Sequence, residues 1–347
     1  MAEILVAMSG GVDSSVAAAL LVEQGHQVTG VTLKLWGGES DSGCCSVSDV
    51  DDARRVAQQL GIDHHVFNFG DEFVEFVIDP YVADYQAGRT PNPCVECNRH
   101  IKFDKLLRRA DALGFDLVAT GHHARIVEDD AGVRHLARGA DEAKDQSYVL
   151  HMLDQQQLAR LVLPVGDITK ERVRELATEL GLRTATKPDS QDVCFIHSDG
   201  GREKFLGDRI PLTPANIVDT DGTVVGHTTS VQLVTIGQRK GLRLAGNAER
   251  NYVIDIDPAT PQVTVGPREL TRTDHTPLSQ LAWTAGPVEA EVMIQAAAHG
   301  RREPGRVDIA SDGSATVRWN APHTRIAAGQ SVVFYVGDQV VGGATAE

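Results

Sequence analysis

The stretch ILVAMSGGVDSSVAAALLVEQG, residues 4–25, decides how the fold of this chain is interpreted. A short apolar run is followed by two glycines and then by a helical pattern that ends at Gly25. Paired glycines let a backbone turn tightly and approach a ligand closely, and the helix that follows directs free N–H groups at an anion. The stretch therefore predicts a strand, a phosphate-binding turn and a helix. It is not a Walker motif, because no Gly-Lys-Ser or Gly-Lys-Thr is present.

Polar side chains in this turn add further ligands for a phosphate group. Ser9, Ser14 and Ser15 supply hydroxyl donors. Asp13 supplies a carboxylate that could hold Mg²⁺ against phosphate oxygens. The turn is thus a candidate nucleotide site.

The alternation of strand and helix continues outward from this turn to about residue 200. Apolar runs such as VTGVTL, HHVFNF and DLVAT alternate with helical patterns such as SDVDDARRVAQQLG and KERVRELATELG, which end at glycine. This order predicts an α/β fold with a doubly wound parallel sheet, whose ligands bind beyond the carboxyl ends of the strands. Beyond residue 200, period-two patterns joined by Asp-Gly, Pro or Gly-Asp turns predict β structure. We expect a nucleotide-binding and catalytic domain at 1–200, a small β-rich domain at 201–265 and a C-terminal β-barrel at 266–347.

Composition limits the classes of protein that remain. The chain has 347 residues, is 41% hydrophobic and carries a formal net charge of −15, which disfavours non-specific binding to nucleic acid. This charge does not exclude a local basic face, such as the one in CNRHIKFDKLLRRA with Lys105 and Arg108, for which a merely solvated helix face is the alternative interpretation. The sequence shows neither a secretory signal nor a membrane-spanning run, so we expect a cytoplasmic protein.

Three of the five cysteines lie in two polar, proline-flanked stretches that we interpret as loops. Cys94 and Cys97 belong to TPNPCVECNRHIKF, residues 90–103, and Cys194 belongs to KPDSQDVCFI, residues 187–196. In a reducing compartment such cysteines tend to be metal ligands or reactive thiols.

Seven motifs in a fixed order indicate the family that this chain resembles. SGGVDSS resembles the pyrophosphate loop of the ATP pyrophosphatases (PP-loop proteins), which transfer AMP to a carbonyl or carboxylate oxygen. Together with TPNPCVECNRHIKF, ATGHHAR, KDQSYVL, PVGDITKERVRELATELGL, DSQDVCFI and TIGQRKGL, it resembles the tRNA-specific 2-thiouridylases, the MnmA family. The similarity runs with specific motifs to about residue 260 and more weakly to the C-terminus.

The resemblance implies a role for individual residues. Cys97 corresponds to the nucleophile and Cys194 to the cysteine that carries a persulfide. The residues implied to contact ATP are Ala7, Met8, Ser9, Gly10, Gly11, Val12, Asp13, Ser14, Leu33 and Gly121. The residues implied to contact tRNA are Asn92, Pro93 and Cys94, at the extruded base, and Lys144, Asp145 and Gln146.

The resemblance also implies a reaction. The C2 oxygen of the wobble uridine, U34, attacks the α-phosphate of ATP, and sulfur from the Cys194 persulfide then replaces AMP at C2. A Cys97–Cys194 disulfide is left and must be reduced. Such an enzyme needs ATP, Mg²⁺, tRNA and a persulfide-donating relay protein or cysteine desulfurase.

At one position the chain departs from the family pattern, and this departure makes a metal site an alternative interpretation. Some members have an aspartate where this chain has Cys94, and the change creates a Cys-x-x-Cys pair. Cys94, Cys97 and Cys194 could then hold zinc or an iron–sulfur cluster. The Cys44–Cys45 pair is interpreted as structural or incidental.

Three alternatives share parts of this pattern. A tRNA lysidine synthetase or amidating ligase would need SGGVDSS but neither Cys97 nor Cys194. A catalytically idle zinc-binding RNA adaptor would use CVEC structurally and would contain stoichiometric zinc. A small-molecule sulfur-transfer enzyme would not need two β domains and a basic helix.

Overall fold

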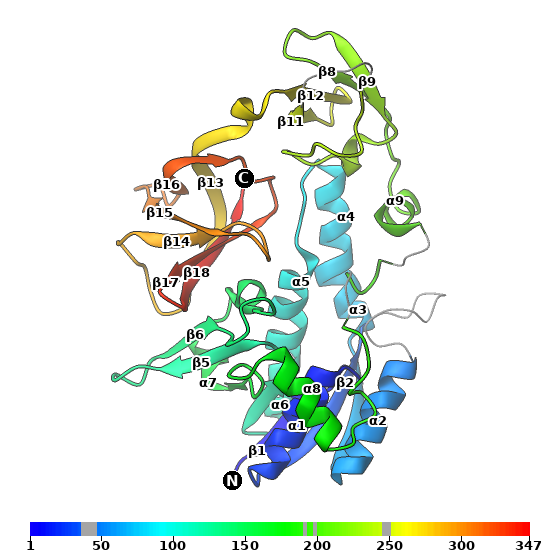
Figure 1. The fold of residues 1–347 in the computed structure, drawn as a ribbon, viewed down its shortest axis with the longest axis vertical. Coiled ribbons are helices and arrows are strands. Elements are labelled where there is room, and N and C mark those ends of the chain that lie inside the picture. Colours follow the sequence, from blue (N-terminus) through cyan, green and yellow to red (C-terminus); the bar gives the residue numbers. More distant parts are fainter. Residues whose placement is uncertain (36–46, 190–192, 197–199, 245–250) are drawn as a thin grey trace.

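The computed structural model describes residues 1–35, 47–189, 193–196, 200–244 and 251–347. Three β-sheets organise the chain, and Figure 1 shows the N-terminal parallel sheet at the bottom, the second sheet at the top and the C-terminal barrel on the left. Among the described residues, no helix has both the length and the apolar character needed to cross a membrane.

The first sheet is parallel and has the strand order β3-β2-β1-β4-β7. Its strands are β1 (Glu3–Ala7), β2 (Gln27–Lys34), β3 (Asp63–Asn68), β4 (Leu117–Thr120) and β7 (Leu161–Val162). Successive side chains of a strand point to opposite faces, and β1 buries both faces. Ile4 and Val6 pack on one side and Leu5 packs on the other. A strand buried on both faces reads as a continuous apolar run, as ILVAM does.

Helices cover both faces of this sheet, which confirms the predicted doubly wound fold. One face carries α1 (Val12–Glu23), α2 (Val47–Leu60) and α8 (Lys170–Glu179), whose apolar residues share one core cluster. Glycines with positive φ, Gly25 and Gly61, follow α1 and α2, as the sequence predicts.

The other face carries two long helical runs that lie beside one another (Figure 1). The first combines α3 (Gly70–Phe73), the π-helical segment η1 (Val74–Ile78) and α4 (Asp79–Gln86), and the second combines α5 (Pro93–Glu96), the π-helical segment η2 (Cys97–Lys105) and α6 (Leu106–Ala112).

The interpretation of the stretch TPNPCVECNRHIKF as a loop is therefore wrong for residues 93–97, whereas the helix expected in the basic stretch after Cys97 is present. Proline is tolerated in the first turn of a helix because its missing N–H has no intrahelical partner there. Asn92 caps this helix by accepting a hydrogen bond from the Cys94 backbone N–H at 3.1 Å. Cys97 consequently lies on a helix and is buried.

After residue 200 the chain turns to β structure, as predicted. The second sheet has the order β10-β9-β8-β12-β11. It contains β8 (Ala215–Val218), β9 (Val224–Thr228), β10 (Arg243–Leu244), β11 (Tyr252–Asp257) and β12 (Gln262–Gly266). The short helices of this half are α9 (Gly201–Gly207), η4 (Val231–Leu233) and η5 (Arg268–Thr271).

Six C-terminal strands close into an antiparallel barrel, because the first of them, β13, also pairs with the last, β18. They are β13 (Arg272–Trp283), β14 (Val292–Gln295), β15 (Arg302–Ile309), β16 (Ala315–Thr324), β17 (Ser331–Val336) and β18 (Gln339–Ala346). A hairpin of the N-terminal part, β5 (Ala124–Glu128) and β6 (Arg134–Arg138), adds to this sheet by pairing β6 with β18.

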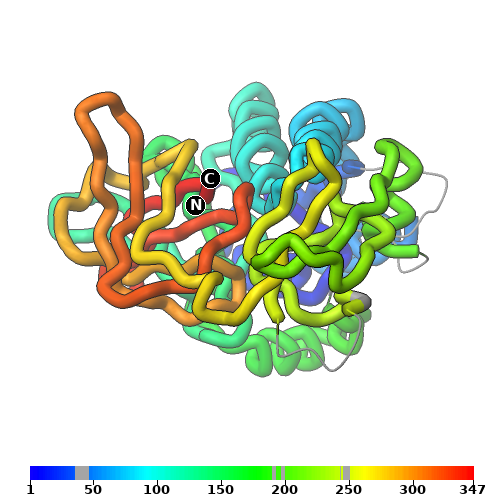
Figure 2. Tube along the Cα trace, turned by 90° about the horizontal axis from the view of Figure 1, so that it is seen from above, coloured from blue at the N-terminus to red at the C-terminus, as the bar shows by residue number. Residues whose placement is uncertain are grey.

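The turn between the two helical runs connects all three parts of the molecule. The Thr90 N–H donates to the Ala328 carbonyl at 2.7 Å, and its hydroxyl lies 3.5 Å from that of Thr235. The second sheet and the barrel also touch, since the Arg325 guanidinium donates to the Ile254 carbonyl at 2.7 Å. Viewed from above, the green to yellow second sheet and the orange to red barrel lie next to one another (Figure 2).

Between the hairpin and α8, the chain forms η3 (Ser147–Leu150) and α7 (Gln155–Ala159), and His151 lies between them. Its Nδ1 lies 2.9 Å from the Tyr148 carbonyl oxygen. A Cβ on Gly343 of β18 would lie 2.2 Å from the His151 ring, so only glycine fits there. Burial lowers the pKa of His151 to about 4, with the Tyr148 carbonyl acting in the opposite sense and Arg99 reinforcing the decrease.

We expect His151 to make stability pH-dependent between about pH 6.5 and about pH 4. Its pKa is lower in the folded than in the unfolded chain, so the unfolded chain binds the proton first and stability falls as the pH falls. A His151→Gln variant should lose about 2 kcal/mol less than the unmodified chain between pH 7 and pH 5, since each pKa unit corresponds to about 1.4 kcal/mol. Urea unfolding at both pH values measures this difference, and equal losses would contradict the prediction.

Candidate active site

The glycine-rich turn lies at the carboxyl end of β1 and opens α1. Gly10 has a φ of +73°, and a Cβ on it would lie 2.3 Å from the Asp49 carbonyl oxygen. The Ser14 hydroxyl accepts a hydrogen bond from the Ser9 N–H at 3.1 Å. Gly11 is the N-cap of α1 and caps it with no side chain, so the first turn of the helix presents N–H groups to an anion. The predicted strand, turn and helix are confirmed.

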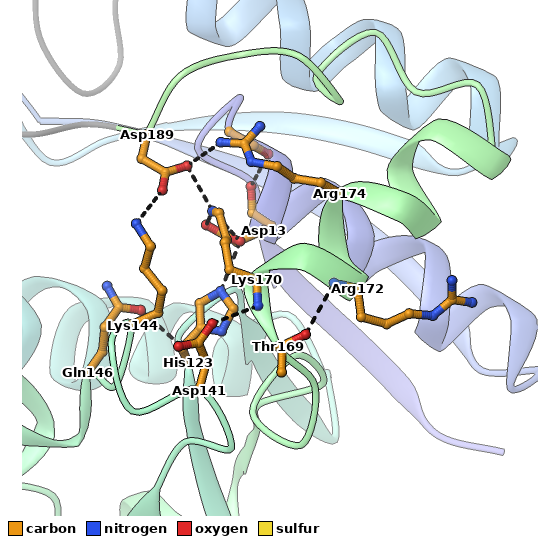
Figure 3. Close-up of polar contacts among 12 residues, drawn as sticks. Asp13, His123, Asp141, Lys144, Gln146, Thr169, Lys170, Arg172, Arg174 and Asp189 are labelled. Carbon is orange, nitrogen blue, oxygen red and sulfur yellow. Dashed lines mark hydrogen bonds and ion pairs between the residues drawn. The ribbon is translucent and has the colours of Figure 1, made fainter.

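Asp13 lies in the first turn of α1 between two basic side chains, as Figure 3 shows. The Lys170 ammonium donates to both carboxylate oxygens, at 2.7 and 2.6 Å, and His123 Nε2 lies 3.0 Å from one of them. Burial alone would raise the pKa of Asp13, but the hydrogen bonds from His123 and Lys170 hold it below its usual value. The carboxylate is therefore ionised at neutral pH.

The end of β4 forms the adjacent wall of the site. A Cβ on Gly121 would lie 2.5 Å from the Ser14 nitrogen, so glycine lets this strand end lie against the nucleotide loop. The His122 ring is buried, and its Nδ1 lies 2.7 Å from the Thr120 hydroxyl. Burial lowers the pKa of His122 well below the usual histidine value, and the charges of Lys102 and His123 add to this effect. His122 is thus neutral.

A pocket of about 340 Å³ opens beyond the carboxyl ends of β1, β2 and β4, where doubly wound folds bind ligands. Seven of the ten residues predicted to contact ATP line it: Ala7, Met8, Ser9, Asp13, Ser14, Leu33 and Gly121. Both predicted catalytic cysteines, Cys97 and Cys194, line the same pocket, as do Pro93, Cys94 and Gln146. The structure thus brings the nucleotide loop and two cysteines, 97 residues apart in sequence, into one cavity.

The remaining residues predicted to contact ATP support the loop from outside the pocket lining. The Gly10 carbonyl oxygen accepts a hydrogen bond from Lys187 at 2.9 Å. Gly11 caps α1, and the Val12 side chain is buried in the core shared by α1, α2 and α8. Asn92, predicted to contact the base, acts as the N-cap of α5.

The side chains of Lys144, Asp145 and Gln146 have different surroundings. Asp145 faces inward: it accepts hydrogen bonds from Arg138 at 2.9 Å and from the Ser147 N–H at 3.0 Å, and 8% of its side chain is exposed. Lys144 pairs with Asp189 at 2.8 Å. Gln146 lines the pocket and accepts a hydrogen bond from the His123 N–H at 2.9 Å. Asp145 therefore stabilises the loop, and of these three residues Gln146 is the one that lines the pocket.

Sequence reasoning assigned no role to Lys170, Lys187 or Asp189, although all three lie in motifs that it quoted. Their partners lie as many as 177 residues away, as for Lys187 and Gly10. The Lys-Pro-Asp sequence at residues 187–189, shortly before Cys194, was a signal that could have indicated a role for Lys187 and Asp189. The groups with which these two residues pair are set by the tertiary structure.

The three cysteines of the described part of the chain differ in their exposure. Cys94 is exposed, Cys97 is buried and Cys194 is half-buried. Within the described ranges, no group of three or more His, Cys, Asp or Glu side chains is arranged to hold a metal ion. The predicted zinc or iron–sulfur alternative thus has no support here, and Cys44 and Cys45 lie outside the described residues.

A single Mg²⁺ held together with phosphate oxygens is a different case. Asp13 is the only carboxylate among the described pocket-lining residues. Mg²⁺ is commonly held by one or two carboxylates plus substrate phosphates, so this donor set fits it.

Comparison with known families and proteins gives matches along almost the whole chain. Residues 2–198 match the family described as tRNA methyl transferase HUP domain, residues 203–267 its PRC-barrel domain and residues 273–346 the aminomethyltransferase beta-barrel domain. The tRNA-specific 2-thiouridylase MnmA of Chloroflexus aggregans is 48% identical over 99% of this chain and 98% of its own length. That of Carboxydothermus hydrogenoformans is 47% identical over 99% and 97%.

Among solved structures, the U34-tRNA thiolase NcsA from Methanococcus maripaludis is 18% identical and covers 60% of this chain and 62% of its own, with a TM-score of 0.37.

The parallel sheet, the glycine-rich turn and the two β-rich parts that follow define an ATP pyrophosphatase of the PP-loop class with C-terminal β domains. Within this class, the chain belongs to the tRNA-specific 2-thiouridylase family, MnmA.

Proposed function

We propose that this enzyme, a tRNA sulfurtransferase, replaces the C2 oxygen of the wobble uridine U34 by sulfur in an ATP-dependent reaction. One observation carries the proposal: the nucleotide loop and the cysteines Cys97 and Cys194 line a single pocket. A lysidine synthetase or an amidating ligase would need the loop but neither thiol.

In the first half-reaction, the C2 oxygen of uridine attacks the α-phosphate of ATP and pyrophosphate leaves. The Ser9 and Ser14 hydroxyls and the N–H groups of the first turn of α1 bind the phosphates. Mg²⁺ held by Asp13 would neutralise charge on the leaving pyrophosphate. The target base must leave its stack to enter the pocket, which Pro93, Cys94 and Gln146 line beside Cys97.

In the second half-reaction, the terminal sulfur of a Cys194 persulfide reaches C2 and AMP leaves. Sulfur arrives either directly, with Cys97 then attacking the Sγ of Cys194, or as hydrosulfide that Cys97 has released. Both routes leave a Cys97–Cys194 disulfide, so an external dithiol must supply two electrons before the next turnover. Lys102 lines the same pocket and provides the positive field that favours thiolates.

The proposed substrate and donor follow from these steps. The substrate is a tRNA with an unmodified U34, and the sulfur comes from a persulfide-donating relay protein or a cysteine desulfurase. Incubation of unmodified tRNA with the enzyme, ATP, Mg²⁺ and a sulfide source, followed by nucleoside analysis, tests the function. We expect 2-thiouridine that depends on ATP, and its absence would contradict the proposal.

The basic face on η2 and α6 is the proposed contact for the tRNA backbone. Lys105 lies over the Phe76 ring at 5.3 Å, and Arg108 is mostly exposed beside Asp104. Changing Lys105 and Arg108 together to Glu should weaken tRNA binding about tenfold and flatten its dependence on salt, because phosphate contacts release counterions. The matched control is Arg54→Glu on α2, which covers the opposite face of the sheet. Equal affinities across a salt series would place the tRNA on another surface.

A further inference from the structure

Two described residues that precede Cys194 in the sequence, Lys187 and Asp189, are attached to the nucleotide loop. The first is Lys187, whose ammonium donates to the Gly10 carbonyl oxygen at 2.9 Å. The same ammonium pairs with Asp49 at 2.6 Å and with Asp52 at 2.8 Å, both on α2. Lys187 is thus joined to the backbone of the turn that binds phosphate.

The second is Asp189, on which three cations converge (Figure 3). Its carboxylate lies 2.8 Å from Lys144, 2.9 Å from Lys170 and 2.7 Å from Arg174. Lys170 also donates to both carboxylate oxygens of Asp13, so one ammonium, 10% exposed, links the nucleotide loop to Asp189. Burial would raise the pKa of Asp189, but the hydrogen bonds from Lys144 and Lys170 lower it to about 2. The anion therefore persists at any physiological pH.

The other side of Cys194 is held by an aromatic cluster. Phe195 is 1% exposed, and its ring packs edge-on against Phe73 at 5.8 Å and against Tyr81 at 5.2 Å between centroids. Cys194 itself is half-buried and lines the pocket. The cysteine therefore lies between an ionic attachment on one side and an apolar attachment on the other.

We propose that Asp189 is a positioning residue that, through Lys170, sets the place of Cys194 relative to the nucleotide loop. The inference rests on the proposed function and concerns only its second half-reaction. Sulfur must approach the carbon that carries AMP, and AMP is held by the loop to which Asp189 is attached. A misplacement of about 1 Å can lower a rate about 100-fold, so this attachment has a kinetic consequence. Asp189 is not among the residues that line the pocket, and Lys170 keeps Asp13 as a partner when Asp189 is changed, so we expect nucleotide binding to be nearly unaffected.

The test is an Asp189→Asn variant, which keeps the size of the side chain but removes the charge that pairs with three cations. In single turnovers with enzyme in excess over tRNA, pyrophosphate release per tRNA should stay within about twofold of the unmodified enzyme. Formation of 2-thiouridine should slow about 30-fold to 100-fold. The adenylated base then persists, or water attacks its C2 and restores uridine with release of AMP. Labelled sulfur should still load onto Cys194 from a persulfide donor, as mass spectrometry would show.

Matched variants separate positioning from a general structural effect. Asp189→Glu, which restores the charge, should recover most of the thiolation. Arg172→Gln removes an exposed ion pair with Glu175 and Glu179 on α8, the helix that also carries Lys170 and Arg174. This variant should change neither half-reaction. Lys187→Met breaks the other attachment and should also slow thiolation more than pyrophosphate release.

Three results would overturn the inference. The first is an equal decrease in the rates of pyrophosphate release and thiolation in Asp189→Asn. The second is an equal decrease in sulfur loading onto Cys194 in that variant. The third is an unchanged rate of thiolation in Asp189→Asn or in Lys187→Met. An unmodified enzyme that releases no pyrophosphate with tRNA would instead contradict the proposed function, so the two failures are distinguishable.

Discussion

A Cys194→Ser variant is expected to lose all thiolation from a persulfide donor, because the oxygen that replaces sulfur cannot carry a persulfide. Some thiolation should remain with free sulfide at high concentration, since sulfide attacks the activated carbon without a carrier. Pyrophosphate release should persist, because adenylation does not need this thiol. Nucleoside analysis with each sulfur source, beside a pyrophosphate assay, measures the three outcomes.

The Cys97→Ser variant should fail at the opposite stage. Loading of Cys194 precedes the step that Cys97 performs, so labelled sulfur should accumulate on Cys194 and 2-thiouridine should not form. Cys97 is buried on η2 and lines the pocket with Cys194, a placement that suits attack on a persulfide held within the site. Mass spectrometry of the variant after incubation with the donor locates the sulfur.

Cys94→Ser is the internal control for both cysteines. Cys94 lies one helical turn before Cys97 and is exposed, and some family members have an aspartate there. We expect a mild loss of activity. Complete and equal loss in all three variants, together with loss of bound iron or zinc, would favour a three-cysteine metal site over the two-thiol mechanism.

Replacement of Asp13 should have the second largest effect, on adenylation. An Asp13→Ala variant removes the only carboxylate that lines the described part of the pocket and leaves Lys170, which is 10% exposed, without one of its two anions. We expect ATP-dependent pyrophosphate release in the presence of tRNA to fall at least about 100-fold, the scale of a lost electrostatic contact at a reacting centre.

Two variants show whether this effect belongs to the site. Asp13→Asn preserves the size of the side chain and should be nearly as defective, because an amide is a poor ligand for Mg²⁺ and pairs weakly with Lys170. Asp51→Asn on α2 removes an exposed carboxylate paired with Arg54 and should be silent. Activity near that of the unmodified enzyme in Asp13→Ala, with an unchanged melting temperature, would remove Asp13 from the metal-binding role.

Local sequence was sufficient for the main features of the fold. The run Ile4–Ala7 is apolar throughout because both faces of β1 are buried, and glycines with positive φ end the flanking helices. The Ser-Gly-Gly-x-Asp-Ser turn also specified its own geometry, since Gly10 adopts a φ that other residues rarely adopt. These signals depend on a few neighbouring residues, so they predict local structure without information from the rest of the chain.

The same local reasoning was wrong for residues 93–97, where the helix begins one turn earlier than expected. Polar letters and two prolines suggested a loop, but Pro93 occupies the first helical turn and Asn92 caps it. The buried face of this helix, with Ile101 and Phe103 fully enclosed, packs on the far side of the sheet. Tertiary packing outweighed a weak local preference, as it often does for short amphipathic segments.

Only the tertiary structure decided which distant groups meet. Pairing of β6 with β18 joins residues about 200 positions apart, and Lys170 bonds to Asp13 across 157 positions. From the local sequence alone, Lys170 could equally be an exposed cation on the first turn of a helix. Its partners, Asp13 and Asp189, come within reach only when α1, α8 and the residues around Asp189 are brought together at the parallel sheet. Charge pairing over such separations depends on distances that arise only when the apolar faces of these elements are buried together, and no local pattern in the sequence encodes them.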